Sequence, residues 1–599
     1  MILRRRFWLP LGIAATLLLF YYSGSSHDIY GWAGTGRSTR KPHFEKNVID
    51  DEAFFWRRLP THYPVKDMKP LPTGKPLKLP RIQNSFGKES LKDAAIRKQR
   101  QEAVKKAFIR CWQSYKAKAF MSDELTPISG KSKDTFGGWG ATLVDSLDTL
   151  WIMSLKEEFE EAVAAAVEIN FTISSLETIN AFETTIRYLG GFLSAYDLSG
   201  DQRLLRKARE VGDMLYKAFD TPNRMPITRW DFDYASQGGQ QVADEAALLA
   251  EVGSFCMEFT RLSLITGDPK WFDAAERIRE VFEEQQSSTQ LPGMWPFTLN
   301  PREKQFAFDN TFGLGALADS TYEYLPKMYA LIGGLIPSYQ KMYEDSMKTT
   351  MKHNFFRPMV PDTVDILISG TLHTIQEDDK MTLDFEHQGQ HLVCFAGGML
   401  AVGGKLFNKP EHLEAARKLV DGCIWAYNAM PLGIMPESFF MAPCKSATEC
   451  EWDEALWKRA VLHQAGEEDL TDMGKADEII SKSRLPKGFT QIAETKYILR
   501  PEAIESVFIL YRVTGRADLL ESAWAMFEAI YKNTKTPLAN SAISDVTVSS
   551  NPPKTDSMES FWMGETLKYF YLIFSEPDLI SLDEWVFNTE AHPFKRLIR

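Results

Sequence analysis

Acidic residues interrupt several apolar helical segments of this 599-residue sequence. In three segments a carboxylate is followed three or four positions later by a second charged group, so both lie on one helix face. The pairs are Glu183 with Arg187, Asp319 with Glu323, and Glu502 with Glu505. Further acids within apolar stretches of the sequence are Glu251, Glu258, Glu437, Glu559 and Glu565. Each needs a counter-charge or a chemical use, because burying an unpaired carboxylate is costly.

Two explanations fit these acids. In the first, each helix exposes its acids to solvent or pairs them, as Arg187 could neutralise Glu183. In the second, the helices form a ring and the acids meet at its centre, where partly dehydrated carboxylates acquire different pKa values. One carboxyl can then protonate a leaving oxygen while another activates water, as glycoside hydrolysis requires. The neighbouring aromatic residues Trp151, Phe561 and Trp562 either stack on sugar rings or belong to the core.

A recurring unit predicts the elements that position these acids. Four times an apolar helix ends at Gly or Asn, a short turn follows, and a new helix carries an alanine eight positions after the turn residue. The turn residues are Gly200, Gly267, Asn408 and Gly515. Helix pairs in tandem stack as an open solenoid or close into a toroid, and the lack of evident polar caps favours closure. Short β-rich stretches at 224–232, 363–370, 380–388 and 545–550 predict hairpins between the pairs.

The charge distribution and the N-terminus indicate a compartment. The net charge is −11 and no long basic run exists beyond Arg4–Arg6, so we expect no nucleic-acid partner. We expect a cytoplasmic tail over 1–6 and a transmembrane signal-anchor over the uncharged residues 7–22, in preference to a cleaved signal peptide. The proline-rich residues 23–90 predict a stem, and helical periodicity over 91–599 predicts a lumenal catalytic domain.

Six cysteines and one glycosylation acceptor fit a lumenal chain. Cys444 and Cys450 flank a short polar loop and could pair, but the sequence does not fix the connectivity. No Cys-x-x-Cys motif or histidine cluster indicates zinc. Asn170-Phe171-Thr172 is an acceptor triplet for an N-linked glycan.

Seven sequence blocks stand in order between about Arg100 and Phe594. They are FGGWGATLVDSLDTLWIM, FETTIRYLGGFLSAYDLSGD, ADSTYEYL, HLVCFAGG, RPEAIESVFILYRVTG, ESFWMGETLKYFYLIF and VFNTEAHPF. Together they resemble the class I α-1,2-mannosidases, which are calcium-dependent inverting glycosidases that trim N-glycans in the secretory pathway. One block alone would be weak evidence, but seven in order are very specific.

The resemblance implies an all-α fold, the (α/α)7 barrel, with short β-hairpins at the loops and a C-terminal segment entering the barrel. It assigns Glu183 as the general acid and associates Asp319 and Glu502 with the attacking water, Glu502 being the base. Other matched pocket positions are Arg187, Leu317, Glu323, Glu437, Arg500, Glu505, Phe561 and Glu565. The implied cofactor is Ca²⁺, bound through the carbonyl and hydroxyl oxygens of Thr589 and supported through water by Glu590.

Some positions refine the resemblance. Members that remove one specific mannose typically carry arginine at the position of Leu317, whereas members that trim several carry leucine, so broader, Golgi-like trimming is implied. Gln390 stands where some members have aspartate, which bears on contacts with glycan branches. Cys394 and Cys423 match the family's disulfide pair. The charged segment from Cys444 to about Ser483 is an insertion relative to shorter members.

The implied activity is hydrolysis of terminal α-1,2-linked mannose from high-mannose N-glycans with inversion, toward the five-mannose form. A single-pass, monomeric protein of the Golgi or endoplasmic reticulum membrane is expected. The alternative within the fold is a glycan-binding degradation lectin with little or no hydrolase activity; the extra regions that such members usually carry are not recognised here. A helical-toroid lyase is disfavoured, because lyases usually use Tyr, His or Arg as base and the convergent groups here are carboxylates.

Overall fold

The structure is a computed structural model that describes residues 54–598, apart from 378–379 and 447. The predicted cytoplasmic tail, the signal-anchor over 7–22 and the first part of the stem therefore lie outside the described residues. In the part of the chain that is described, no helix is both long and apolar enough to cross a membrane.

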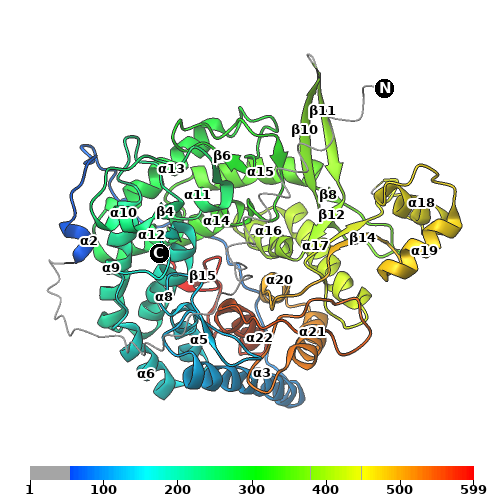
Figure 1. The fold of residues 1–599 in the computed structure, drawn as a ribbon, viewed down its shortest axis with the longest axis horizontal. Coiled ribbons are helices and arrows are strands. Elements are labelled where there is room, and N and C mark those ends of the chain that lie inside the picture. The colour runs from blue at the N-terminus through cyan, green and yellow to red at the C-terminus, as the bar shows by residue number, and fades with distance from the viewer. Residues whose placement is uncertain (1–53, 378–379, 447, 599) are drawn as a thin grey trace, which may run out of the picture. The chain divides into compact units, whose positions relative to one another are not determined.

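Seven helix pairs form a ring, with one helix of each pair on the inside and one on the outside (Figure 1). The inner helices are α5 (Leu147–Ile152), α8 (Gly190–Ser199), α12 (Cys256–Thr266), α14 (Asp319–Leu331), α16 (Phe395–Leu406), α20 (Glu502–Thr514) and α22 (Leu567–Ile573). Their outer partners, in the same order, are α6 (Lys156–Ala166), α9 (Gln202–Lys217), α13 (Lys270–Gln285), α15 (Ser338–His353), α17 (Pro410–Ala429), α21 (Asp518–Thr534) and α3 (Leu91–Lys118).

The ring closes on itself. Each inner helix from α5 to α22 contacts the next one around the ring. The π-helical segment Trp562–Thr566, which leads into α22, packs against α5, and α22 pairs with α3 from the start of the domain. The predicted (α/α)7 barrel is thus confirmed. Because each outer helix leads through a connection to the next inner one, from α3 to α21, all inner helices run in the same direction.

The predicted turn residues end inner helices. Gly200, Gly267 and Gly515 have φ angles of 74–75°, and Asn408 has 52°. This left-handed conformation closes a helix and suits Gly best and Asn next. The alanines eight positions later, at 208, 275, 416 and 523, are all buried where the outer helix meets the inner one.

Shorter helices precede or connect the pairs. They are α2 (Phe55–Arg58), α4 (Ala141–Asp145), α7 (Ala181–Glu183), α10 (Phe232–Ser236), α11 (Leu249–Gly253), α18 (Glu454–Gln464), α19 (Met473–Ser483) and a 3₁₀ turn (Leu392–Cys394). A second π-helical segment, Thr184–Leu189, joins α7 to α8 without a break.

The strands are short and antiparallel. The two-stranded pairs are β1 (Glu124–Leu125) with β2 (Ser132–Lys133), β3 (Thr178–Asn180) with β4 (Arg229–Asp231), β5 (Ala247–Leu248) with β6 (Thr298–Leu299), β8 (Phe355–Phe356) with β9 (Ile368–Ser369), and β15 (Trp585–Phe587) with β16 (Pro593–Lys595). The three-stranded sheets are β11 (Lys380–Glu386), β10 (Thr371–Glu377) and β7 (Thr311–Phe312), and β12 (Gln388–Gln390), β13 (Ser438–Met441) and β14 (Phe489–Glu494).

Three of the four predicted β stretches contain strands, namely β4, β9 and β11. The prediction for 545–550 was wrong, because this stretch forms turns and no strand. Asp545 accepts a hydrogen bond from the backbone N–H of Thr547 (2.9 Å), and Val546 is fully buried. The β-branched residues there serve packing and turn formation, since side chains of Asp compete locally for backbone groups.

The described part of the predicted stem, residues 54–90, lies against the barrel. Trp56 is fully buried, and its indole N–H donates to the carbonyl of Phe171. The backbone N–H groups of His62 and Tyr63 donate to Asp220, and that of Asn84 donates to the carbonyl of Arg512. These bonds connect the segment to helix pairs on different sides of the ring.

An accessory hairpin of helices, α18 and α19, is inserted between β13 and β14 (Figure 1). It has a small apolar cluster of its own that includes Trp457, Val461 and Leu485. Cys444 and Cys450 form a disulfide at its entry, and Cys394 and Cys423, the pair implied by the resemblance, form another. Cys111 and Cys256 are free and buried.

Candidate active site

Three carboxylates stand at the beginnings of inner helices. Asp319 is the first residue of α14, Glu502 is the first residue of α20, and Glu183 lies in the first turn of the continuous helical segment 181–199. The inner helices are parallel, so these starts lie at the same end of the barrel. All three residues are partly exposed although their helix neighbours are mostly buried, which indicates that they face an open hollow.

The turn between β15 and β16 reaches this hollow from the C-terminal side of the chain. β15 contacts α14 and β16 contacts α8, which puts the hairpin inside the ring (Figure 1). Thr589 and Glu590 lie in the turn, and Thr589 is partly exposed. The predicted C-terminal segment inside the barrel is therefore confirmed.

Arg187 joins the first catalytic candidate to this turn. Its guanidinium donates to Glu183 Oε2 (2.9 Å) and to Glu590 Oε2 (2.6 Å), across 403 residues of sequence in the second case. The side chain of Arg187 lies on the π-helical segment Thr184–Leu189 and is buried. Such widened turns are frequent at functional sites, because they reorient side chains that an α-helix would stack regularly. The ion pair also means that Arg187 partly neutralises Glu183, so both explanations of this pair hold.

A second cation lies among the acids of α14 and α20. Lys327 is buried, contacts Glu323 closely, and its ammonium lies 3.5 Å from Glu505 Oε1. Glu565, on the other π-helical segment, is buried nearby. Burial and the negative charges of Glu590 and Glu502 raise the pKa of Glu565 well above its usual value. This end of the barrel therefore contains more carboxylates than cations.

Glu502 is held as a carboxylate. His391 Nδ1 lies 2.7 Å from Glu502 Oε2, and the guanidinium of Arg500 lies 3.5 Å from Oε1. Arg500 in turn donates to Glu437 Oε2 (2.5 Å). Burial alone would raise the pKa of Glu502, but the hydrogen bond from His391 and the charge of Arg500 outweigh it and lower the pKa below its usual value. Glu502 is therefore ready to accept a proton at neutral pH.

Asp319 lies in a different environment. Burial, together with the negative charges of Glu323 and Glu502, raises its pKa to about 7. The backbone N–H of Ser320 and the charge of Arg500 oppose this shift without cancelling it. The pKa of Asp319 is thus raised above its usual value, while the pKa of Glu502 is lowered. Opposite shifts of two neighbouring carboxylates are the arrangement that separates acid and base roles.

The sequence model of glycosyl hydrolase family 47 matches residues 107–596. This range contains all the carboxylates described above. The chain belongs to glycosyl hydrolase family 47.

Relatives within family 47 carry explicit names. The chain is 34% identical over 523 residues to mannosyl-oligosaccharide 1,2-alpha-mannosidase MNS1 of Arabidopsis thaliana, covering 85% of this chain and 82% of the relative. It is 34% identical over 503 residues to the human endoplasmic reticulum mannosyl-oligosaccharide 1,2-alpha-mannosidase, covering 82% of this chain and 64% of the relative. The solved structure of an alpha-1,2-mannosidase from Trichoderma reesei superposes with a TM-score of 0.70 at 30% identity, covering 83% of this chain and 99% of that one.

Leu317 and Phe561, the remaining predicted pocket residues of this family 47 chain, are largely buried. Leu317 lies two residues before Asp319 with a φ of 82°, a conformation that costs energy for a side chain of this kind. Its carbonyl accepts from the N–H of Ala250. At Gly315, two residues before Leu317, an added Cβ would lie 2.5 Å from Gln390 Oε1, so this side chain lies against the backbone there. Gln390 Oε1 accepts from the N–H of Ala316 (3.0 Å), so Gln390 holds the loop that carries Leu317.

The roles of two site residues of this family 47 chain were not predicted. His391 begins one of the seven sequence blocks but was assigned no role, and Lys327 is a single lysine within an apolar helix, which predicts nothing by itself. Of the proposed sugar-stacking aromatics, Trp562 is fully buried and cannot meet a ligand. Trp151 packs against Phe159 and lies under the ammonium of Lys156, outside the site.

Three further acids have structural surroundings. Glu251 accepts from Asn180 and pairs with Arg229, and burial raises its pKa. Glu258 is fully buried on α12. Glu559 is half-buried, and its negative charge adds to burial in raising the pKa of Glu124.

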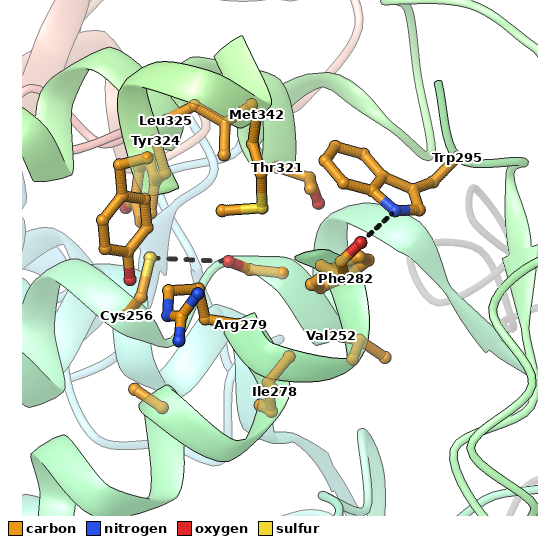
Figure 2. Close-up of a pocket in the computed structure, with 13 residues that line it drawn as sticks. Val252, Cys256, Ile278, Arg279, Phe282, Trp295, Thr321, Tyr324, Leu325 and Met342 are labelled. Atoms are coloured by element: carbon orange, nitrogen blue, oxygen red, sulfur yellow. Dashed lines mark hydrogen bonds between the residues drawn. The ribbon is translucent and has the colours of Figure 1, made fainter. Parts of the chain in front are cut away.

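A small cavity lies apart from the catalytic candidates. It encloses about 20 Å³ between α11, α12, α13, α14 and α15, and its wall includes Cys256, Arg279 and Met342 (Figure 2). In Figure 2 the Cys256 thiol donates to the carbonyl of Gly253 (3.6 Å). This volume holds about one water molecule, so the cavity is a packing defect beside the site and not a substrate pocket.

Proposed function

We propose that this chain removes terminal α-1,2-linked mannose from high-mannose N-glycans by hydrolysis with inversion. The observation that carries the proposal is the meeting of Glu183, Asp319 and Glu502 at one end of the barrel, where the pKa of Asp319 is raised and that of Glu502 is lowered. Family 47 membership and the names of the relatives agree with this activity. A lectin of the same fold would not need a base held as a carboxylate, so the hydrolase is favoured over the lectin.

Each carboxyl has a role in the proposed reaction. Glu183 protonates the glycosidic oxygen of the leaving sugar, and Arg187 orients its carboxyl. Glu502 accepts a proton from the attacking water on the opposite side of the sugar ring, which gives inversion. Asp319 accepts a hydrogen bond from that water or from the ring hydroxyls. Arg187, Glu323, Glu437, Arg500, Glu505, Phe561 and Glu565 bind and orient the sugar.

Calcium suits the residues around Thr589. Neither its hydroxyl nor its carbonyl oxygen accepts a hydrogen bond from any residue that the structure describes, so both are free for a ligand. Burial, and then neighbouring negative charges, raise the pKa values of Glu505 and Glu590, which a nearby dication would relieve. No three His, Cys, Asp or Glu side chains of residues 54–598 form a direct metal cage. An oxygen-seeking ion completed by water and sugar hydroxyls is the ion that such a site fits.

We therefore assign the cofactor as Ca²⁺, held by the two oxygens of Thr589 and supported through water by Glu590. When bound, Ca²⁺ would coordinate two neighbouring sugar hydroxyls and stabilise charge on the distorted ring. The protein's own contribution is to place the acid and the base on either side of that ring.

The finer assignments follow the same reasoning. Leu317 leaves room for different glycan branches, so we assign trimming of several mannoses toward the five-mannose form. We assign the protein as a monomer in the endoplasmic reticulum or Golgi membrane, with a lumenal barrel. The disulfide between Cys394 and Cys423 supports an oxidising compartment.

A fluorescent nine-mannose glycan tests the proposal. We expect the purified chain to release mannose in the presence of calcium, to stop at five or so mannoses, and to form the β-anomer first, as proton NMR of the fresh product reports. No release under these conditions would contradict the hydrolase, and an α-anomer would contradict inversion.

A further inference from the structure

A buried tyrosine holds the turn that carries Thr589 from behind. Tyr324 lies on α14 next to Glu323, on a different face of the helix from the acids. Its hydroxyl donates to Glu258 Oε1 (2.8 Å) and accepts from the backbone N–H of Thr589 (3.2 Å). A single hydroxyl thus connects the helix that begins at Asp319 with the turn, 265 residues away in sequence.

Glu258 fixes the direction of this hydroxyl. It is fully buried on α12, and its Oε1 also accepts from the amide of Asn588 (2.8 Å). Its other oxygen has no hydrogen-bond partner among the described residues. Because Glu258 Oε1 accepts from both Asn588 and Tyr324, the proton of Tyr324 points at Glu258 and a lone pair is left for the N–H of Thr589.

The same amide of Asn588 organises the rest of the turn. Asn588 Oδ1 accepts from the backbone N–H groups of Glu590 (2.9 Å) and His592 (2.8 Å), and Nδ2 also donates to the carbonyl of Ile186 (3.0 Å). Gly190 on α8 lies so close to this residue that a Cβ at position 190 would be 2.7 Å from Asn588 Nδ2. The turn therefore has little freedom, and its anchor points converge on Glu258.

We propose that Tyr324 and Glu258 are positioning residues that set the geometry of the calcium site at Thr589. The inference rests on the proposed role of calcium. The carbonyl and hydroxyl oxygens of Thr589 can bind the ion together only in one orientation of this residue. The hydrogen bond from its N–H to the hydroxyl of Tyr324 fixes that orientation. Outer partners of this kind typically change metal affinity about 10–100-fold when they are removed. In this proposal both residues act through the backbone of Thr589 and not by contact with the ion.

The test compares two neighbouring buried tyrosines in the full chain. Tyr324→Phe removes the hydroxyl that holds Thr589. Tyr322→Phe is the matched control, because the Tyr322 hydroxyl is equally buried and makes two bonds to the backbone of Trp295 but none to the turn. Calcium affinity is measured by isothermal titration after chelation, and the unfolding temperature is measured without calcium.

We expect calcium affinity to fall at least about tenfold in Tyr324→Phe and to stay within about twofold of the wild type in Tyr322→Phe, although both lose stability without calcium. Glu258→Leu is the second variant if Tyr324→Phe is not folded, and it has the same expected result. Wild-type calcium affinity in the folded Tyr324→Phe or Glu258→Leu variant would overturn the inference. If the wild type itself binds no calcium, the cofactor assignment fails first and the inference fails with it; the wild-type titration alone reveals that case.

Discussion

The imidazole of His391 lies between Glu502 and Tyr427. Nδ1 is 2.7 Å from Glu502 Oε2, and Nε2 is 2.7 Å from the hydroxyl of Tyr427. Since the carboxylate can only accept, Nδ1 carries a proton, and Nε2 shares a second hydrogen bond with the tyrosine. His391 is fully buried, so this orientation is not exchanged for water. The proposed base is thus held by a histidine that lies 111 residues away in sequence.

Replacing His391 by Ala is expected to shift the acidic limb of the pH–rate profile to higher pH. The hydrogen bond from His391 lowers the pKa of Glu502, so its loss raises that pKa. The base works when ionised, and in the variant ionisation occurs at higher pH. A plot of kcat/KM against pH checks this, with Tyr427→Phe as the control that keeps the bond to Glu502. An unchanged acidic limb in His391→Ala would contradict the role of His391.

Glu183→Gln and Glu502→Gln should separate the acid from the base. Each substitution is expected to reduce kcat on the natural glycan by about 10²–10⁴-fold, the usual size of general acid–base catalysis. With α-mannosyl fluoride, whose leaving group needs no proton, Glu183→Gln is expected to recover much of its rate while Glu502→Gln is not. Recovery of the Glu502 variant alone would reverse the two assignments.

Removal of calcium is expected to abolish activity and to lower the unfolding temperature. A ligand present at a hundred times its Kd stabilises the folded state by about 2.7 kcal/mol. Thermal unfolding with EGTA, followed by addition of calcium or magnesium, measures the effect. We expect calcium to restore both properties and magnesium to fail, because magnesium demands a tighter octahedral shell and gives up its water reluctantly. Full activity in EGTA would rule the cofactor out.

The described part of the predicted stem should contribute to the stability of the barrel. Trp56 is fully buried and packs against Trp230 and Phe232. We expect Trp56→Ala to lower the free energy of unfolding by about 3–5 kcal/mol in urea titrations, as large core truncations do. Leu77→Ala, at a side chain that is 50% exposed, is the control and should change it by no more than about 0.5 kcal/mol. Equal effects of Trp56→Ala and Leu77→Ala would mean that residues 54–90 do not stabilise the barrel.

Asn170 is expected to carry an N-linked glycan in a secretory host. It is exposed, and its Oδ1 accepts from the N–H (3.0 Å) and the hydroxyl (2.7 Å) of Thr172. Mass spectrometry of the peptide with and without a glycan-releasing amidase measures occupancy. Asn170→Gln and Thr172→Ala should lose the glycan, and Thr172→Ser should keep it. A C-terminal tag with a second acceptor triplet is the control for entry into the secretory pathway. If the tag carries a glycan and Asn170 does not, the prediction for Asn170 is wrong, although the lumenal location is not contradicted.

The pairing of helices could be predicted because its signal is local. A left-handed residue follows four of the inner helices, and Gly or Asn adopts that conformation at Gly200 and Asn408 with little strain. The stretch 545–550 has the same β-branched composition as a strand but no partner strand beside it. Strand formation depends on a distant neighbour, and composition does not report one.

The site could be predicted only in part for the same reason. Acids within apolar stretches marked Glu183 and Glu502, but the same signal marked Glu258, which is buried behind the turn that carries Thr589. An acidic residue that faces a pocket and one that faces a neighbouring helix produce the same pattern in a single sequence. His391 begins one of the seven sequence blocks, but its role was not predicted, because that role comes from its distance to Glu502.

The place of the β15–β16 hairpin inside the ring affects how the enzyme comes into being. Ribosomes make Arg187 long before they make Glu590, so the ion pair between them forms only when the last part of the barrel has been synthesised. We therefore expect nascent chains, and products of premature termination before Glu590, to build most of their helices while the centre of the ring stays incomplete.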